Sequence, residues 1–303
     1  MQSLFAPPRP MRGGVSFRPF TLQSREVVSR PGAELEVLLL RFALPEGGAA
    51  SLGLTQPTTH VKVLCSGAAW LPRARTFSLV SDADERGSFA IAVKVRPGGR
   101  ASPALAALRP GVDAARFAHT LTKRLAAPLD GANARGARLA LVVFGVGATE
   151  VLLTARRALR AGQRVTLLAA ARTAADLLFV REFCAAAAEA FRDSAANGGE
   201  ARGPPPMQLR LLLSREEPPA ALLGELDTLC GGAPGAAARC GVAAARGRID
   251  AASVCAAFPS AEWRGAAALC VGTKAQAREA YALLAASGVT RRLLGRPVLW
   301  NCW

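Results

Sequence analysis

The first third of the chain alternates between apolar and polar residues with a period of two, which is typical of β-strands with one buried face. Turn-forming segments such as LPEGG and DADERG separate the alternating runs. The pattern predicts strands at residues 15–30, 34–43, 60–65, 76–80 and 88–95. Short strands joined by turns predict an antiparallel barrel or sandwich for this part of the chain.

The pattern then changes, because continuous apolar runs begin to alternate with amphipathic stretches. The apolar runs RLALVVFGVG, RVTLLAAAR, MQLRLLLSR and AAALCVG are typical of buried strands. The amphipathic stretches ATEVLLTARRALRAG, TAADLLFVREFCAAAAEAFRDSA and TKAQAREAYALLAAS predict helices, with Thr173 as the N-cap of the second. Strands that alternate with helices predict a doubly wound parallel α/β sheet.

These two patterns predict two domains, and 303 residues are enough for two ordinary cores. Residues 1–14 are expected to be a basic tail, residues 15–130 a β-barrel domain and residues 131–303 an α/β domain. Within the latter, the Ala/Gly/Pro-rich residues 218–246 are expected to be an irregular insertion. Function is expected in the cleft between the domains, at the carboxyl ends of the parallel strands.

The net charge indicates which kind of binding partner suits the chain, and the cysteine content indicates which kind of compartment does. The formal net charge of +16 suits an acidic partner, whereas scattered arginines and 6% aromatic residues do not favour specific nucleic-acid binding. The seven cysteines are odd in number and form no CxxC, which argues against a disulfide framework and a zinc site and favours a reducing compartment. No apolar run is long enough to predict a transmembrane helix.

The segment Met1–Arg25 contains four arginines, several serines and no acidic residue. This composition resembles a transit segment and predicts a mitochondrial location. The alternative is a short basic tail before a strand that already starts at Val15.

A glycine pair follows the first buried strand and opens the first helix of the α/β part. Gly145 and Gly147 would let a pyrophosphate approach the backbone at a helix N-terminus. The alternative is that they serve close packing, because the third position of a GxGxxG fingerprint is Glu150.

Several segments occur in the order found in one family. They are RTFSLVS (Arg75–Ser81), GSFAIAVKV (Gly87–Val95), PGGRASPALAAL (Pro97–Leu108), FGVGATE, AARTAADLLFVREF, GRIDAASVCAAFP (Gly247–Pro259) and LCVGTKAQ. In this order and spacing the chain resembles the ferredoxin reductase superfamily, and most closely its cytochrome b5 reductase branch. The resemblance implies an FAD-binding β-barrel followed by an NAD(P)-binding α/β domain.

The resemblance assigns FAD contacts to the first domain. Arg75 would pair with an FAD phosphate, Phe77 would pack on the flavin, and Ser78 would hydrogen-bond its ring or ribityl chain. The glycine turn with its helix N-terminus would cradle the diphosphate, and a lysine would reach the adenylate side; these residues are Lys94, Gly98, Gly99 and Ser102. The alternatives are a surface arginine, ordinary strand alternation, a solvated lysine, and a simple turn with its cap. His60 matches the histidine of the family's GxH element, or is a structural strand histidine.

The resemblance likewise assigns NADH or NADPH contacts to the second domain. Four residues would line the pyridine nucleotide: Gly145, Gly147, Thr149 and Gly272. Three others sit where the adenosine ribose would lie: Arg172, Thr173 and Asp176. Arg172 would favour a 2′-phosphate, or is a plain exposed arginine.

The departures from the family pattern fall mainly on the nicotinamide side. Phe144 replaces the first glycine of the nicotinamide loop, Glu150 replaces its proline, and CVGT stands where the family has CGPP. In the FAD half, Phe77 replaces the tyrosine, Thr59 replaces the glycine before the histidine, and the glycine-proline-glycine element after LRPG is missing.

Two functions follow from this comparison. The first is a flavoprotein oxidoreductase that passes electrons from NAD(P)H through FAD to a haem or iron–sulfur acceptor, with the basic surface steering an acidic electron-transfer protein. The second is a non-catalytic accessory or structural subunit of a larger, membrane-associated mitochondrial complex, which keeps the reductase fold and its FAD site. The eroded nicotinamide motifs support the second, whereas the resemblance over most of the chain supports the first.

Overall fold

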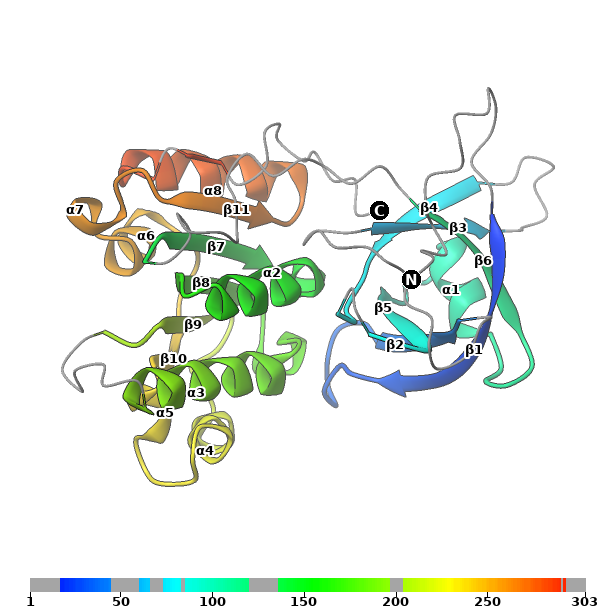
Figure 1. Cartoon of the computed structure of the whole chain (residues 1–303), viewed down its shortest axis with the longest axis horizontal. Helices are drawn as coiled ribbons and strands as arrows, with labels where there is room; N and C mark the ends of the chain where they lie inside the picture. Colours follow the sequence, from blue (N-terminus) through cyan, green and yellow to red (C-terminus); the bar gives the residue numbers. More distant parts are fainter. Residues whose placement is uncertain are drawn as a thin grey trace. The chain divides into compact units, whose positions relative to one another are not determined.

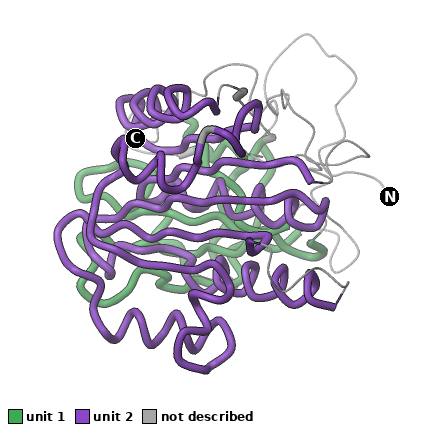
Figure 2. The backbone as a smooth tube through the Cα atoms, turned by 90° about the vertical axis from the view of Figure 1, so that its left-hand side faces the viewer, with its two compact units in different colours: residues 1–123 green, residues 124–303 purple. Residues whose placement is uncertain are grey.

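The structure is a computed structural model that describes residues 17–44, 60–65, 73–82, 85–119, 136–196, 204–289 and 291–292. The chain forms two compact units, residues 1–123 and 124–303, which Figure 1 and Figure 2 show. Each unit contains its own six-stranded sheet. The expected tail at residues 1–14 and the expected boundary at residue 130 lie outside the described residues.

The first unit is an antiparallel barrel, as the sequence predicts. Its strand order is β4-β3-β6-β1-β2-β5. Among the described residues, the bridge Leu79↔Ile91, just after β4, joins the two end strands and closes the ring. The strands, with one short helix, are β1 (Arg18–Val27), β2 (Val37–Ala43), β3 (His60–Cys65), β4 (Arg73–Ser78), β5 (Ser88–Lys94), α1 (Ala101–Ala106) and β6 (Ala114–His119).

Four phenylalanines form the centre of this barrel, each from a different strand. Phe117 of β6 lies within 5.8 Å, ring centre to ring centre, of Phe20, Phe42 and Phe89, in edge-to-face geometry. All four are at most 2% exposed. Edge-to-face pairs add to the free energy of apolar burial, so this cluster stabilises the first unit.

The second unit is a parallel sheet with helices on both faces, also as predicted. Its strand order is β10-β9-β8-β7-β11-β12, and each neighbouring pair is parallel. The strands are β7 (Arg138–Phe144), β8 (Arg164–Ala171), β9 (Met207–Leu213), β10 (Val242–Arg246), β11 (Ala267–Val271) and β12 (Arg291–Arg292). The helices are η2 (Gly145–Gly147), α2 (Ala148–Arg160), η3 (Ala174–Asp176), α3 (Val180–Ala196), α4 (Ala220–Leu229), α5 (Ala236–Arg239), α6 (Ala251–Ala257), α7 (Ser260–Trp263) and α8 (Lys274–Ala286), of which η2 and η3 are 3₁₀ turns.

The strand order reverses at β7, because β8, β9 and β10 follow on one side and β11 and β12 on the other. Helices α2 and α3 pack on one face of the sheet, as Figure 1 shows. The other face packs against α6, α7 and α8 through a core that includes Val142, Val254, Phe258, Trp263 and Leu284. In a doubly wound sheet the ligand site lies outside the carboxyl ends of the strands at the reversal. Here that point is the pair β7 and β11.

The prediction that residues 218–246 form an irregular insertion is wrong. The segment contains α4, α5 and β10, and β10 pairs with β9 from Val242↔Leu209 to Arg246↔Leu213. The Asp227 carboxylate accepts hydrogen bonds from the backbone N–H groups of Gly235 and Ala237, at 3.0 and 2.9 Å. These bonds lower the pKa of Asp227 and tie the end of α4 to the start of α5. Tertiary contacts therefore order a segment whose composition is typical of a loop.

Buried thiols contribute to the same region. Cys184 of α3, Cys230 after α4 and Cys240 after α5 are all at most 8% exposed. Burial raises the pKa of the Cys184 thiol, and burial together with neighbouring Cys240 raises that of Cys230 to about 11. The two thiols are therefore protonated at neutral pH and pack as small apolar groups.

The helix predicted from Thr173 begins later than expected. Residues Ala174–Asp176 form a 3₁₀ turn, Leu177 is extended, and Phe179 has a φ of 57°. The α-helix begins at Val180, where Phe183 N donates to Phe179 O at 3.0 Å. A left-handed phenylalanine interrupts the helical hydrogen-bond ladder, which the helical periodicity of the sequence does not reveal.

Candidate functional site

Strand β4 carries three of the predicted FAD contacts and pairs with β3. Arg75 lies opposite Val63, Phe77 opposite Val61, and Ser78 opposite His60. Side chains alternate along a strand, so Arg75 and Phe77 share one face and Ser78 projects from the other. All three are half-buried. The Arg75 guanidinium donates one hydrogen bond, of 3.2 Å, to the carbonyl of Ala74, which leaves most of its donors for another group.

His60 is only 5% exposed and lies beside Ser78. A histidine buried in a paired strand suits the structural alternative. This position shows no opening toward a ligand.

Strands β4 and β5 form the closing seam of the barrel. Val80 N donates to Ala90 O at 2.9 Å, and Ala90 N donates to Ser81 Oγ at 3.0 Å. Arg75 on β4 and Lys94 on β5 lie on the same side of the Leu79↔Ile91 bridge. Because Leu79 pairs with Ile91, the alternation of side chains puts Arg75 and Lys94 on opposite faces of the barrel wall.

A tight turn follows β5 and contains the predicted diphosphate cradle. Gly99 N donates to Arg96 O at 3.0 Å, and Gly98 has a φ of 73° after Pro97. Proline followed by a left-handed glycine is the signature of a type II turn. A Cβ on Gly98 would meet no atom within 4 Å, so the surface over this turn is open.

Ser102 supports the turn, because its Oγ accepts a 3.1 Å hydrogen bond from Arg96 N. The hydroxyl proton is not used in that bond. Helix α1, which begins beside it, has only six residues. The turn backbone and its cations, rather than a long helix dipole, are therefore the elements that suit a diphosphate.

The charged residues near the glycine turn also suit a diphosphate. The segments 73–81 and 88–108 contain no acidic residue. Their basic residues are Arg73, Arg75, Lys94, Arg96 and Arg100. An open glycine turn between cations fits the two phosphates of FAD, so the residues present are compatible with this cofactor.

The glycine loop after β7 is built by packing. A Cβ on Gly147 would lie 2.9 Å from Val271 Cγ1 and 3.0 Å from Val271 O, so only glycine lets α2 approach β11 this closely. Gly145 has a φ of 53°, which glycine adopts readily. Thr149 is 5% exposed, and its hydroxyl donates to Val146 O at 3.0 Å. The packing alternative thus accounts for Gly147 and Thr149 without a ligand.

Phe144 and Gly272 lie together at the point where the strand order reverses. Phe144 ends β7 and Gly272 follows β11. A Cβ on Gly272 would lie 2.7 Å from Phe144 Cδ2 and 3.2 Å from Phe144 Cβ. The phenyl ring therefore lies directly against Gly272, and it also packs on the core beneath α6, α7 and α8.

Glu150 stands in the first turn of α2 and is only 3% exposed. A carboxylate near a helix N-terminus is stabilised by the helix dipole, which is the same interaction that would hold a phosphate. Phe144 and Glu150 are thus the two side chains of this loop that differ from the family pattern, and both lie at the edge of the sheet where the strand order reverses. They alter the size and chemistry of the loop that would line NADH or NADPH.

The predicted ribose contacts gather at the carboxyl end of β8. Thr173 Oγ1 donates to Asp176 Oδ2 at 3.0 Å, and Arg172 is exposed. Ala174 N donates to Glu216 Oε1 at 2.6 Å. Sequence reasoning missed Glu216, although its position just after β9 was the available signal. Two carboxylates here disfavour a 2′-phosphate and oppose the role considered for Arg172.

The described residues contain no cluster of His, Cys, Asp or Glu that could hold a metal ion. None of the helices described is long and apolar enough to cross a membrane.

Comparisons with known proteins agree with this architecture. Residues 19–116 match the family model of the oxidoreductase FAD-binding domain. No curated protein matches the chain. The cytochrome b5 reductase domain of Ulva prolifera nitrate reductase is 18% identical, with a TM-score of 0.63 over 91% of this chain and 97% of that one.

Two further solved structures share the fold. Amycolatopsis cytochrome P450 reductase GcoB is 20% identical, with a TM-score of 0.63 over 93% of this chain and 71% of that one. The CS-b5R domains of human Ncb5or are 14% identical, with a TM-score of 0.53 over 81% of this chain and 59% of that one. The resemblance drawn from the sequence is confirmed at the level of the fold.

Proposed function

We propose that this chain, which has the fold of the ferredoxin reductase superfamily and an oxidoreductase FAD-binding domain at residues 19–116, is a flavoprotein oxidoreductase. The observation that carries the proposal is the open glycine turn after β5, which Arg96 and Arg100 flank, within the segment that matches the FAD-binding domain model. Bound FAD would supply the exchange between two-electron and one-electron transfer. The acceptor would be a haem or iron–sulfur protein.

The residues of the first unit would bind and orient the cofactor. The Arg75 guanidinium and the N–H groups of the turn would neutralise the diphosphate. Phe77 would lie against the flavin and exclude water from it, and Ser78 would hydrogen-bond its polar edge. The net charge of +16 would steer an acidic electron-transfer protein toward the chain.

A second candidate function is favoured by Phe144. Because its ring lies against Gly272 where the family pattern has a glycine, the second unit would keep the shape of a dinucleotide domain with an altered loop. This arrangement supports an accessory subunit of a membrane-associated mitochondrial complex, in which FAD is structural. The two candidates share the FAD site and differ in whether NADH or NADPH reduces it.

The visible spectrum of the purified protein separates them. An oxidoreductase that takes electrons from NADH or NADPH is yellow and bleaches when that nucleotide is added. An accessory subunit stays yellow with both nucleotides and bleaches only with dithionite. A colourless protein that FAD cannot reconstitute would contradict both.

Arg75→Ala is expected to weaken FAD binding about ten- to hundredfold, because a charge-assisted contact to phosphate is lost. The quenching of flavin fluorescence during titration of the apoprotein measures the affinity. Arg116→Ala is the matched control, since Arg116 is an exposed arginine on β6 of the same barrel. Equal FAD affinities for the two variants would remove Arg75 from the site.

A further inference from the structure

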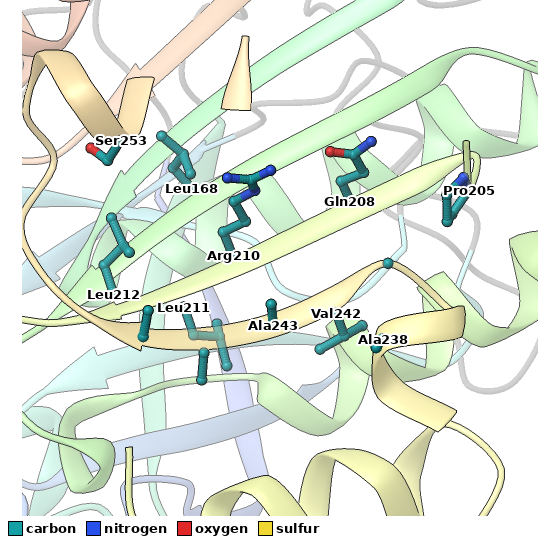
Figure 3. Close-up of a pocket in the computed structure, with 13 residues that line it drawn as sticks. Leu168, Pro205, Gln208, Arg210, Leu211, Leu212, Ala238, Val242, Ala243 and Ser253 are labelled. Atoms are coloured by element: carbon teal, nitrogen blue, oxygen red, sulfur yellow. The ribbon is translucent and has the colours of Figure 1, made fainter. Parts of the chain in front are cut away.

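A groove of about 440 Å³ lies on the sheet of the second unit, on the face that α6, α7 and α8 leave open beyond β8 (Figure 3). It runs along β9 and β10 and reaches Ser253 of α6. A smaller hollow of about 190 Å³ adjoins it, since both are lined by Pro205, Gln208 and Arg210. The groove has the size of a small-molecule site. It is separate from the residues assigned to FAD and to the pyridine nucleotide.

The strand register decides which side chains form the floor. Gln208 and Arg210 alternate with inward-facing Leu209 on β9, and Figure 3 shows both rising into the groove. Arg210 lies beside Leu168 of β8 and Ala243 of β10. The floor is therefore apolar around one guanidinium and one amide.

Arg210 and Gln208 are half-buried. Within the described part of the chain, neither side chain makes a hydrogen bond or an ion pair. Nearby Arg138 differs, because its guanidinium pairs with Glu262 at 2.5 Å and lies over the Trp263 ring. A half-buried guanidinium without a counter-charge is costly, and its planar fork matches a carboxylate. An anion in the groove would remove that cost.

Alanines give the groove its depth. Ala243 and Ala245 of β10 are exposed on this side. They leave room over the sheet for an apolar body beside Arg210. An anion alone would leave this apolar floor in water, so a ligand with an apolar part fits better than a simple ion.

We propose that this groove binds a small organic carboxylate with an apolar chain, whose carboxylate is held by Arg210 and Gln208 and whose chain lies over Leu168, Leu212 and the alanines of β10. The groove has small-molecule dimensions, which favours such a ligand over a protein segment.

Isothermal titration of the full-length protein with octanoate tests the proposal, because the heat of binding does not depend on FAD or on electron transfer. Wild type is expected to bind octanoate at least tenfold more tightly than either acetate or 1-octanol, since acetate lacks the chain and 1-octanol lacks the charge. Arg210→Gln is expected to lower octanoate affinity about ten- to hundredfold. Arg210→Lys, which keeps the charge without the fork, should fall between the two.

Two further variants control for folding and for binding elsewhere. Ala243→Phe fills the groove at a strand position that tolerates aromatic residues, and is expected to abolish the heat of binding. Arg278→Gln removes an exposed arginine of α8 that lines neither hollow and should bind octanoate like wild type. Circular dichroism confirms that each variant is folded. No octanoate binding by wild type, or wild-type affinity in folded Arg210→Gln or Ala243→Phe, would overturn the proposal.

Discussion

Replacing Phe117 with alanine is expected to destabilise the first unit by about 3–5 kcal/mol, the usual cost of removing a buried phenylalanine. Its side chain is 0% exposed and touches three other rings from three other strands. The cavity would sit at the centre of the barrel, where the paired strands cannot collapse to fill it. Scanning calorimetry should show the transition of the first unit falling by about 10 °C or more.

Val27→Ala is the matched control for this prediction. Val27 is an apolar residue of the same barrel but is 54% exposed, so its truncation should change stability by no more than about 0.5 kcal/mol. The transition of the second unit should stay in place in both variants, because each unit has its own core. A Phe117→Ala protein that melts like Val27→Ala would show that the aromatic cluster does not hold the barrel together.

The double change Phe144→Gly and Glu150→Pro is expected to improve binding of NADH or NADPH by at least tenfold. The first substitution removes the ring that lies against Gly272, and the second removes a buried carboxyl group from the first turn of α2, so both restore residues of the family pattern. Proline is tolerated at residue 150, since it is the third residue of α2 and the N–H groups of the first turn have no partner within the helix. Titration calorimetry with each nucleotide measures the gain.

Phe144→Leu separates size from aromatic character in this experiment. A leucine still covers Gly272, so this variant should bind the nucleotides no better than wild type. If the double variant also shows no gain while remaining folded, these two residues are not what closes the site. If NADH binding improves more than NADPH binding, the carboxylates of Asp176 and Glu216 disfavour the 2′-phosphate of NADPH.

The sequence predicted the strands that contain a run of large apolar residues or a clear alternation, and it missed two short strands in which alanine prevails. HVKVLC and SFAIAVKV became β3 and β5 nearly residue for residue. AARFAH and VAAAR became β6 and β10, which the sequence did not predict. Alanine favours helices by intrinsic propensity, so only pairing with neighbours makes these segments strands. That information is tertiary and does not appear in local periodicity.

In the candidate site, too, some features can be predicted from the local sequence and others depend on tertiary contacts. The turn at Gly98 is readable from the sequence, because a proline followed by glycine has a local meaning. The role of Gly147 cannot be predicted from the sequence, since glycine serves the approach of a ligand and close packing equally well. Only the 2.9 Å approach to Val271, far along the chain, decides between them. Phe144 was recognised as a departure from the family pattern, but its contact with Gly272 required the fold.

The closing seam of the barrel, between β4 and β5, also affects the rate at which a bound molecule dissociates. Among the described residues, one bridge with its flanking hydrogen bonds joins β4 to β5, whereas full ladders join the other neighbours. A barrel whose end strands are joined at one bridge can open locally at that bridge while the other strand pairs stay hydrogen-bonded. Such local opening costs only a fraction of the free energy of global unfolding. A molecule bound beside Arg75 and the turn at Gly98 would then leave by local opening of the seam. Its residence time would be independent of the melting temperature of the barrel.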